Sequence, residues 1–127
     1  MTDDPPPFSP QHPRYFPGWA RDIYRRDGWR VVEPGSPFGS TMGFHGKDWH
    51  PDSFLALVEE KNEVELPLLV ARHPGEGAFT RLVERLHGDG YRVGVVSPLG
   101  PLAAHLARVG WYRERRSDRG EIWRKLD

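Results

Sequence analysis

One short segment, residues 72–78 with the sequence RHPGEGA, constrains the fold of this chain more than any other feature. An apolar run, residues 66–71, precedes it, and an amphipathic stretch, residues 79–87, follows it. This order predicts a strand, a glycine-rich turn and a helix. The two glycines allow positive φ and a close approach of the backbone, and a helix start offers free N–H groups and a positive dipole end. The segment therefore indicates a phosphate site, with an ordinary strand-to-helix turn as the alternative.

The segments after this turn predict an alternation of helices and strands. The first helix stops at the Gly-Asp-Gly sequence of residues 88–90, and residues 91–97 follow as an apolar strand. A second helix ends at Gly110, and residues 111–115 and 121–125 flank a turn typical of a β-hairpin. We expect both helices to be right-handed crossovers between parallel strands, with the hairpin as an antiparallel edge.

The N-terminal half predicts shorter elements. Residues 1–13 are rich in proline, so we expect a disordered arm ahead of a single domain of residues 14–127. Apolar residues recur at helical spacing in residues 16–24, and Gly28 ends this helix. Residues 29–33 then predict a short strand.

Three further predictions concern the middle of the chain. Residues 38–45 indicate a second strand, and Asp52 is the expected N-cap of a short helix that runs to about residue 62. The strand before the glycine turn contains Pro67, which removes a ladder hydrogen bond. Pro67 must therefore lie at a bulge or where the strand leaves its neighbour.

Composition excludes several classes of function. The chain has no cysteine, which rules out disulfides, thiolate metal sites and a cysteine nucleophile. No apolar run approaches about 20 residues and the N-terminus does not resemble a signal peptide, so we expect a cytoplasmic protein without a membrane span. His45, Asp48 and His50 fall within six positions but match no zinc signature, so we expect no metal site.

The pattern Arg-x-x-Gly-x-Gly-Ala at residues 72–78 resembles the acyl-CoA pyrophosphate loop of the GNAT (GCN5-related N-acetyltransferase) superfamily, whose pattern is Gln/Arg-x-x-Gly-x-Gly/Ala. Gly110-Trp111 resembles the Gly-Phe pair that ends the last helix of that family. The order of elements from Glu63 onward is also that of the C-terminal half of a GNAT domain. The resemblance covers about half the chain and implies an α/β fold, with a mixed, partly split central sheet and helices on both faces.

The resemblance implies acetyl-CoA as cofactor and an amine as acceptor. The pyrophosphate would lie over the backbone amides of the loop, and the pantetheine arm would follow the preceding strand. The cofactor-binding residues implied are Leu69, Val70, Ala71, Arg72, Gly75, Glu76, Gly77 and Ala78. The strands around Val70 and Val95 would begin together and diverge toward their C-terminal ends, which opens a slot for the cofactor.

Catalysis by attack of a neutral amine on a thioester needs a base, donors for the oxyanion and an acid for the leaving thiolate. The family's frequent acid, a tyrosine four residues before the Gly-Phe pair, is replaced by Leu106, and its frequent asparagine after the second strand is absent. The alternative for Glu63 and Glu65 is a solvated strand edge, and the alternative for His105 is a surface histidine without a role. The candidates are Glu63 and Glu65 for the base, and Ser97, His105 and Tyr112 for the acid, of which we predict Glu65, Ser97 and His105.

Charge is distributed unevenly along the chain. Residues 108–125 carry a net charge of +4, and residues 33–65 carry −5. The family's last hairpin borders the acceptor site, so a basic hairpin from Arg113 to Lys125 would suit an acidic acceptor, including nucleic acid. A solvated edge that resists strand addition is the alternative. We therefore predict a small acyl-CoA-dependent N-acyltransferase, with a catalytically silent GNAT-like module that binds nucleic acid or protein, or a GNAT-like DNA-modifying protein, as alternatives.

Overall fold

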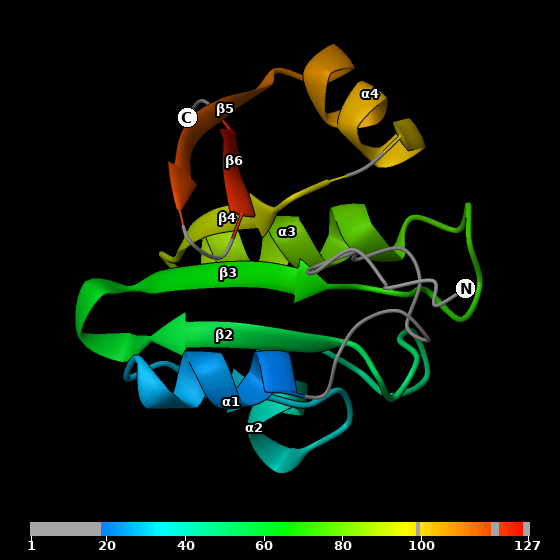
Figure 1. Cartoon of the computed structure of the whole chain (residues 1–127). Coiled ribbons are helices and arrows are strands. Elements are labelled where there is room, and N and C mark those ends of the chain that lie inside the picture. Colours follow the sequence, from blue (N-terminus) through cyan, green and yellow to red (C-terminus); the bar gives the residue numbers. More distant parts are fainter. Residues whose placement is uncertain (1–18, 99, 118–119, 126–127) are drawn as a thin grey trace, which may run out of the picture.

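The computed structural model describes residues 19–98, 100–117 and 120–125, and in this part of the chain six strands form one mixed sheet (Figure 1). The strands are β1 (Arg30–Val32), β2 (Phe54–Val58), β3 (Glu63–Leu68), β4 (Arg92–Val96), β5 (Trp111–Ser117) and β6 (Gly120–Lys125). The helices are α1 (Trp19–Arg26), α2 (Pro37–Thr41), α3 (Ala78–Gly88) and α4 (Gly100–Arg108), with one 3₁₀ turn, η2 (Glu59–Lys61). The predicted α/β class is confirmed.

The strands follow the order β1-β2-β3-β4-β6-β5 across the sheet. β3 and β4 are parallel and α3 connects them, as predicted, while the other neighbours are antiparallel. The expected parallel pairing of β4 with β5 was wrong, because β6 lies between them. Ile122 of β6 is fully buried and Trp123 packs against the core, which suits an inner strand. β5 carries the charged residues Arg113 and Glu114, which suit an edge.

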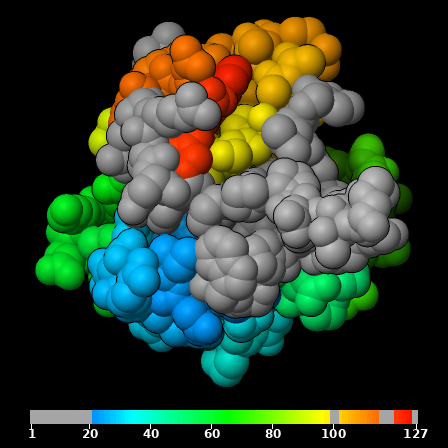
Figure 2. Space-filling model, viewed as in Figure 1, coloured from blue at the N-terminus to red at the C-terminus, as the bar shows by residue number. Residues whose placement is uncertain are grey.

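Two cores lie on opposite faces of the sheet. α3 packs its apolar side on one face, together with Leu106 of α4. α1 covers part of the other face through Tyr24, which is fully buried beside Phe54, Ala56 and Leu68. In the space-filling view α1 lies at the surface of this second face (blue in Figure 2). The expectation of helices on both faces of the sheet is confirmed.

Residues 54–58 form β2, so the helix predicted from Asp52 to about residue 62 was wrong. Phe54 and Ala56 belong to the core under α1, whereas Leu55 and Leu57 belong to the core under α3. A strand buried on both faces is apolar at every position, and the spacing of a few apolar residues does not separate it from a helix. Only residues 59–61 are helical, as the single turn η2.

The strand predicted at residues 38–45 was also wrong, because α2 takes its place. Ser36 is the N-cap, and its Oγ accepts the backbone N–H of Gly39 at 3.0 Å. Pro37 occupies the first turn, where a missing N–H is tolerated and its fixed φ suits a helix. Met42 and Phe44, which follow, are buried in the core under α3.

The other predicted elements are present within the described residues, but the strand that was expected to lead up to the glycine turn ends earlier, at Leu68. α1 ends just before Gly28, whose φ is +89°, and β1, β3, α3, β4, α4 and the β5–β6 hairpin follow in the expected order. The proline-rich arm of residues 1–13 lies outside the described part of the chain. Among the described helices, none has the length and apolar character needed to cross a bilayer.

Candidate functional site

The candidate site begins where β3 leaves β4. Their parallel ladder runs from the pair Glu63↔Arg92 to the pair Leu66↔Val95 and ends there, directly before Pro67. On the β2 side the register changes between Ala56↔Glu65 and Phe54↔Leu68, so β3 carries one extra residue at this point. Pro67 therefore lies both at a bulge and where the strands part, as its missing N–H requires. The predicted split of the sheet is confirmed.

The backbone after the split is paired on one side. The N–H of Val70 donates to Ser53 Oγ at 2.9 Å, and the carbonyl of Val70 accepts the N–H of His50 at 2.8 Å. Backbone groups alternate in direction along an extended chain, so those of Leu69 and Ala71 face the opposite side, from which β4 has departed. No backbone group of the described residues is bonded to them. Within the described part of the chain they therefore form a row of donors and acceptors without backbone partners beside the split.

The glycine loop, residues 72–77, continues this segment into α3. Gly75 and Gly77 have φ values of +85° and +81°, which a side chain would strain. Gly77 is the N-cap of α3 and has no side chain to accept the first-turn N–H groups. The loop is exposed, whereas Ala78 is buried and anchors the helix start. The positive end of the α3 dipole therefore faces solvent at the loop.

Two arginines fix the loop to the segment of residues 46–49. Arg72 Nε donates to the carbonyl of Gly46 at 2.6 Å and to that of Trp49 at 3.1 Å. Arg81 Nη1 donates to the carbonyl of Glu76 at 2.6 Å, and its Nη2 lies 3.8 Å from Asp48 Oδ1. Arg81 was not among the predicted site residues. It follows Gly77 by four residues, and residues at this spacing lie on the same face of a helix, so the sequence pattern could have indicated its place beside the helix start.

The predicted base, Glu65, lies beside the split on the face that α1 covers. It is paired with Gly94, one register step before the ladder ends. Its side chain is fully buried, and Tyr24 Oη donates to its Oε1 at 3.0 Å. The alternative interpretation of Glu65 as part of a solvated strand edge was therefore wrong. Glu63 is also engaged, because Arg124 Nη2 donates to its Oε1 at 2.6 Å.

The two predicted acids lie on different elements, Ser97 directly after β4 and His105 on α4. Ser97 follows β4 with a φ of +46°; its N–H donates to the carbonyl of Glu121 at 2.7 Å, and its Oγ accepts the N–H of Glu121 at 3.2 Å. His105 is half-buried on α4, which packs against β5. The adjacent Leu106 is fully buried in the core, so this position offers no acid. Tyr112 is exposed on β5, away from the split.

Much of the positive charge on the hairpin is compensated where side chains are described. Arg113 Nη1 lies 2.9 Å from a carboxylate oxygen of Glu121. Arg124 is almost fully buried, with Nη2 2.6 Å from Glu63 and Nε 3.1 Å from Glu114. The side chains of residues 115–119 lie outside the described part. Two arginines of the hairpin that the sequence offered for nucleic-acid binding, Arg113 and Arg124, are thus paired with carboxylates of the same protein.

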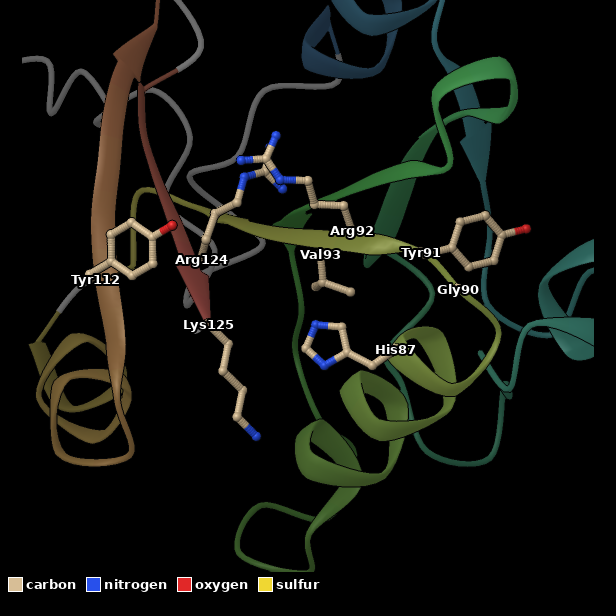
Figure 3. A pocket seen from close by; sticks show the side chains of 8 residues that line it. All are labelled: His87, Gly90, Tyr91, Arg92, Val93, Tyr112, Arg124 and Lys125. Atoms are coloured by element: carbon tan, nitrogen blue, oxygen red, sulfur yellow. The ribbon is translucent and has the colours of Figure 1, made fainter. Parts of the chain in front are cut away.

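A separate cavity of about 460 Å³ lies at the start of β4, at the opposite end of that strand from the split. Arg92 and Arg124 extend toward one another there (Figure 3), and both approach Glu114 Oε2. The cavity is lined by His87, Gly90, Tyr91, Arg92, Val93, Tyr112, Arg124 and Lys125. It is therefore distinct from the glycine loop.

Two of the three candidate metal ligands of the 45–50 segment, Asp48 and His50, contact other protein groups. His50 Nδ1 accepts the N–H of Asp52 at 3.2 Å, and the Asp48 carboxylate faces Arg81. Within the described residues, no group of three His, Asp or Glu side chains is placed to hold a metal ion.

Comparison with known proteins returned no match, whether with protein-family models, with curated proteins or with solved structures.

Proposed function

We propose that this protein is a GNAT-like N-acyltransferase that transfers an acyl group from acetyl-CoA to an amine. The observation that carries the proposal is the end of the β3–β4 ladder at Leu66↔Val95, with the backbone of Leu69 and Ala71 facing the opening. This open segment runs directly into the glycine loop. The order matches the chemical order of the cofactor, in which amides of the pantetheine arm precede a pyrophosphate.

Each part of the proposed site suits one part of acetyl-CoA. An extended chain with amide groups can bond to an open strand edge through the backbone alone. A pyrophosphate needs several donors and positive potential, which the uncapped start of α3 supplies. Arg72 adds a guanidinium whose Nη groups have no bond to any described residue, while its Nε fixes it to Gly46 and Trp49.

We assign roles to the polar residues that are compatible with their contacts. Acetyl-CoA would supply the acyl group as a thioester at the split. Glu65 would accept the proton of the attacking amine, and the hydroxyl of Tyr24 would hold its carboxylate in place. Ser97 Oγ uses a lone pair toward the N–H of Glu121 and keeps its own hydrogen, so it can donate a hydrogen bond that stabilises the leaving thiolate, which then takes its proton from water. His105 is the alternative acid.

The first experiment measures acetyl-CoA binding by calorimetry. We expect a Kd between about 1 µM and 1 mM, the ordinary range for enzyme substrates. Absence of heat from a folded protein at about 1 mM ligand would refute the proposal. If the same protein bound a DNA duplex with an affinity that falls steeply with salt, the binding-module alternative would replace it.

A matched pair of variants tests the loop assignment. Gly77→Glu would place a carboxylate where the pyrophosphate binds, and we expect at least a ~100-fold loss of affinity from like-charge repulsion. Gly90→Glu makes the same substitution at the other end of α3, at a φ of +91° with open space around an added Cβ. Both variants carry the same backbone strain and charge, so only Gly77→Glu should lose binding. Equal affinities for the two variants would contradict the assignment.

A further inference from the structure

A basic groove of about 380 Å³ lies beside the first turns of α3, on the side of the 43–48 segment. We call it the Lys47 groove. Its lining residues are Gly43, His45, Lys47, Asp48, Ala78, Arg81, Leu82 and Arg85.

The walls of the Lys47 groove are held by specific contacts. Arg85 Nη2 donates to the carbonyl of Thr41 at 2.7 Å, and its Nε donates to Asp89 Oδ2 at 3.0 Å. Gly43 has a φ of +81°, and a Cβ at this position would lie 3.0 Å from Arg85 Cγ. Only glycine therefore lets this segment approach α3 so closely. The Gly43 segment and Arg85, which form one side of the groove, are therefore held in place by the fold.

The charge of the Lys47 groove is positive. Lys47, Arg81 and Arg85 line it against a single carboxylate, that of Asp48. Arg81 lies 3.8 Å from that carboxylate, and Arg85 is paired with Asp89. Lys47 is exposed and forms no ion pair with any described residue. An anion entering the groove would therefore meet a free ammonium group.

The groove adjoins the glycine loop through two residues of α3. Ala78 and Arg81 line the groove, and Arg81 Nη1 also bonds to the carbonyl of Glu76 in the loop. A ligand with a diphosphate at the loop and another phosphate a short distance away can occupy both. We propose that the Lys47 groove binds the 3′-phosphate of acyl-CoA, an inference that rests on the proposed function. Lys47 would make a charge-assisted contact with this phosphate.

The test compares acetyl-CoA with acetyl-3′-dephospho-CoA by calorimetry. We expect the wild-type protein to bind acetyl-CoA about tenfold more tightly, which corresponds to about 1.4 kcal/mol. Lys47→Ala should lower the affinity for acetyl-CoA by about the same factor and leave the affinity for acetyl-3′-dephospho-CoA unchanged. Lys61→Ala, an exposed lysine in η2 outside the groove, is the matched control and should keep the wild-type ratio.

The outcomes separate this inference from the proposed function. Equal affinities of the wild-type protein for the two ligands would overturn the 3′-phosphate assignment and leave acyl-CoA binding intact. An equal loss of affinity for both ligands in Lys47→Ala would also overturn it, because the lysine would then contact a part that the two ligands share. Failure of both ligands to bind would overturn the proposed function together with the inference.

Discussion

Gly94→Ala tests the packing of Arg124 across the sheet. An added Cβ at Gly94 would lie 3.0 Å from Ile122 Cγ2 and 3.2 Å from Arg124 Nη1. Ordinary contacts between such atoms are about 3.5–4.0 Å, and both neighbours are buried. The methyl group therefore crowds both the buried side chain of Ile122 and the guanidinium that binds Glu63.

The magnitude follows from three effects. Overpacking of a buried site costs about 1–3 kcal/mol. Displacement of Arg124 weakens its 2.6 Å bond to Glu63, and a hydrogen bond to a charged group contributes about 1.5–3 kcal/mol. Replacing glycine by alanine within a strand stabilises the folded state by about 0.5–1 kcal/mol, because alanine loses less backbone entropy on folding. We expect Gly94→Ala to lower the free energy of unfolding by about 2–4 kcal/mol.

The assay is urea denaturation followed by tryptophan fluorescence, since the chain has five tryptophans. With a slope of about 2 kcal/mol/M, the midpoint should fall by about 1–2 M. Gly88→Ala is the matched control, because it makes the same change at the end of α3 with no atom within 4 Å of the added Cβ. It should stabilise the protein by about 0.5–1 kcal/mol. A Gly94→Ala variant as stable as wild type would refute the close packing of Ile122 and Arg124 against Gly94.

Three further substitutions test the structure elsewhere. Ser36→Ala removes the N-cap bond to Gly39 and should cost about 1 kcal/mol in the same titration, whereas no loss would mean that α2 is capped in another way. Tyr24→Phe removes the donor to the buried carboxylate of Glu65 and should cost about 1–3 kcal/mol; an unchanged midpoint would show that this bond contributes nothing. Leu55→Ala should cost about 2–5 kcal/mol because β2 is buried on both faces, and a loss below about 0.5 kcal/mol would contradict that position.

The strand, glycine turn and helix around residues 72–78 were predictable because each depends on local chemistry. Glycine determines where positive φ occurs, and the apolar period determines the helix face of α3. Pro67 likewise required a bulge or a departing neighbour from its missing N–H alone. The order of elements after Glu63 followed from the same local signals. The sequence by itself thus determined the loop and the strand that leads into it.

Tertiary structure decided the features that depend on residues far apart in the sequence: the identity of β2, the strand order and the partners of the polar side chains. Residues 54–58 became a strand because β1 and β3 pair with them and two cores bury their faces, and neither condition is written in the segment itself. β6, with its buried Ile122, lies beside β4, and β5 lies at the edge of the sheet, although both strands of the hairpin carry apolar residues. Glu65 accepts a hydrogen bond from Tyr24, which lies 41 positions away in the sequence, and Arg72 donates to the carbonyl of Gly46. Such contacts depend on how the chain closes on itself, so local pattern predicted the residue types of the site but not their partners.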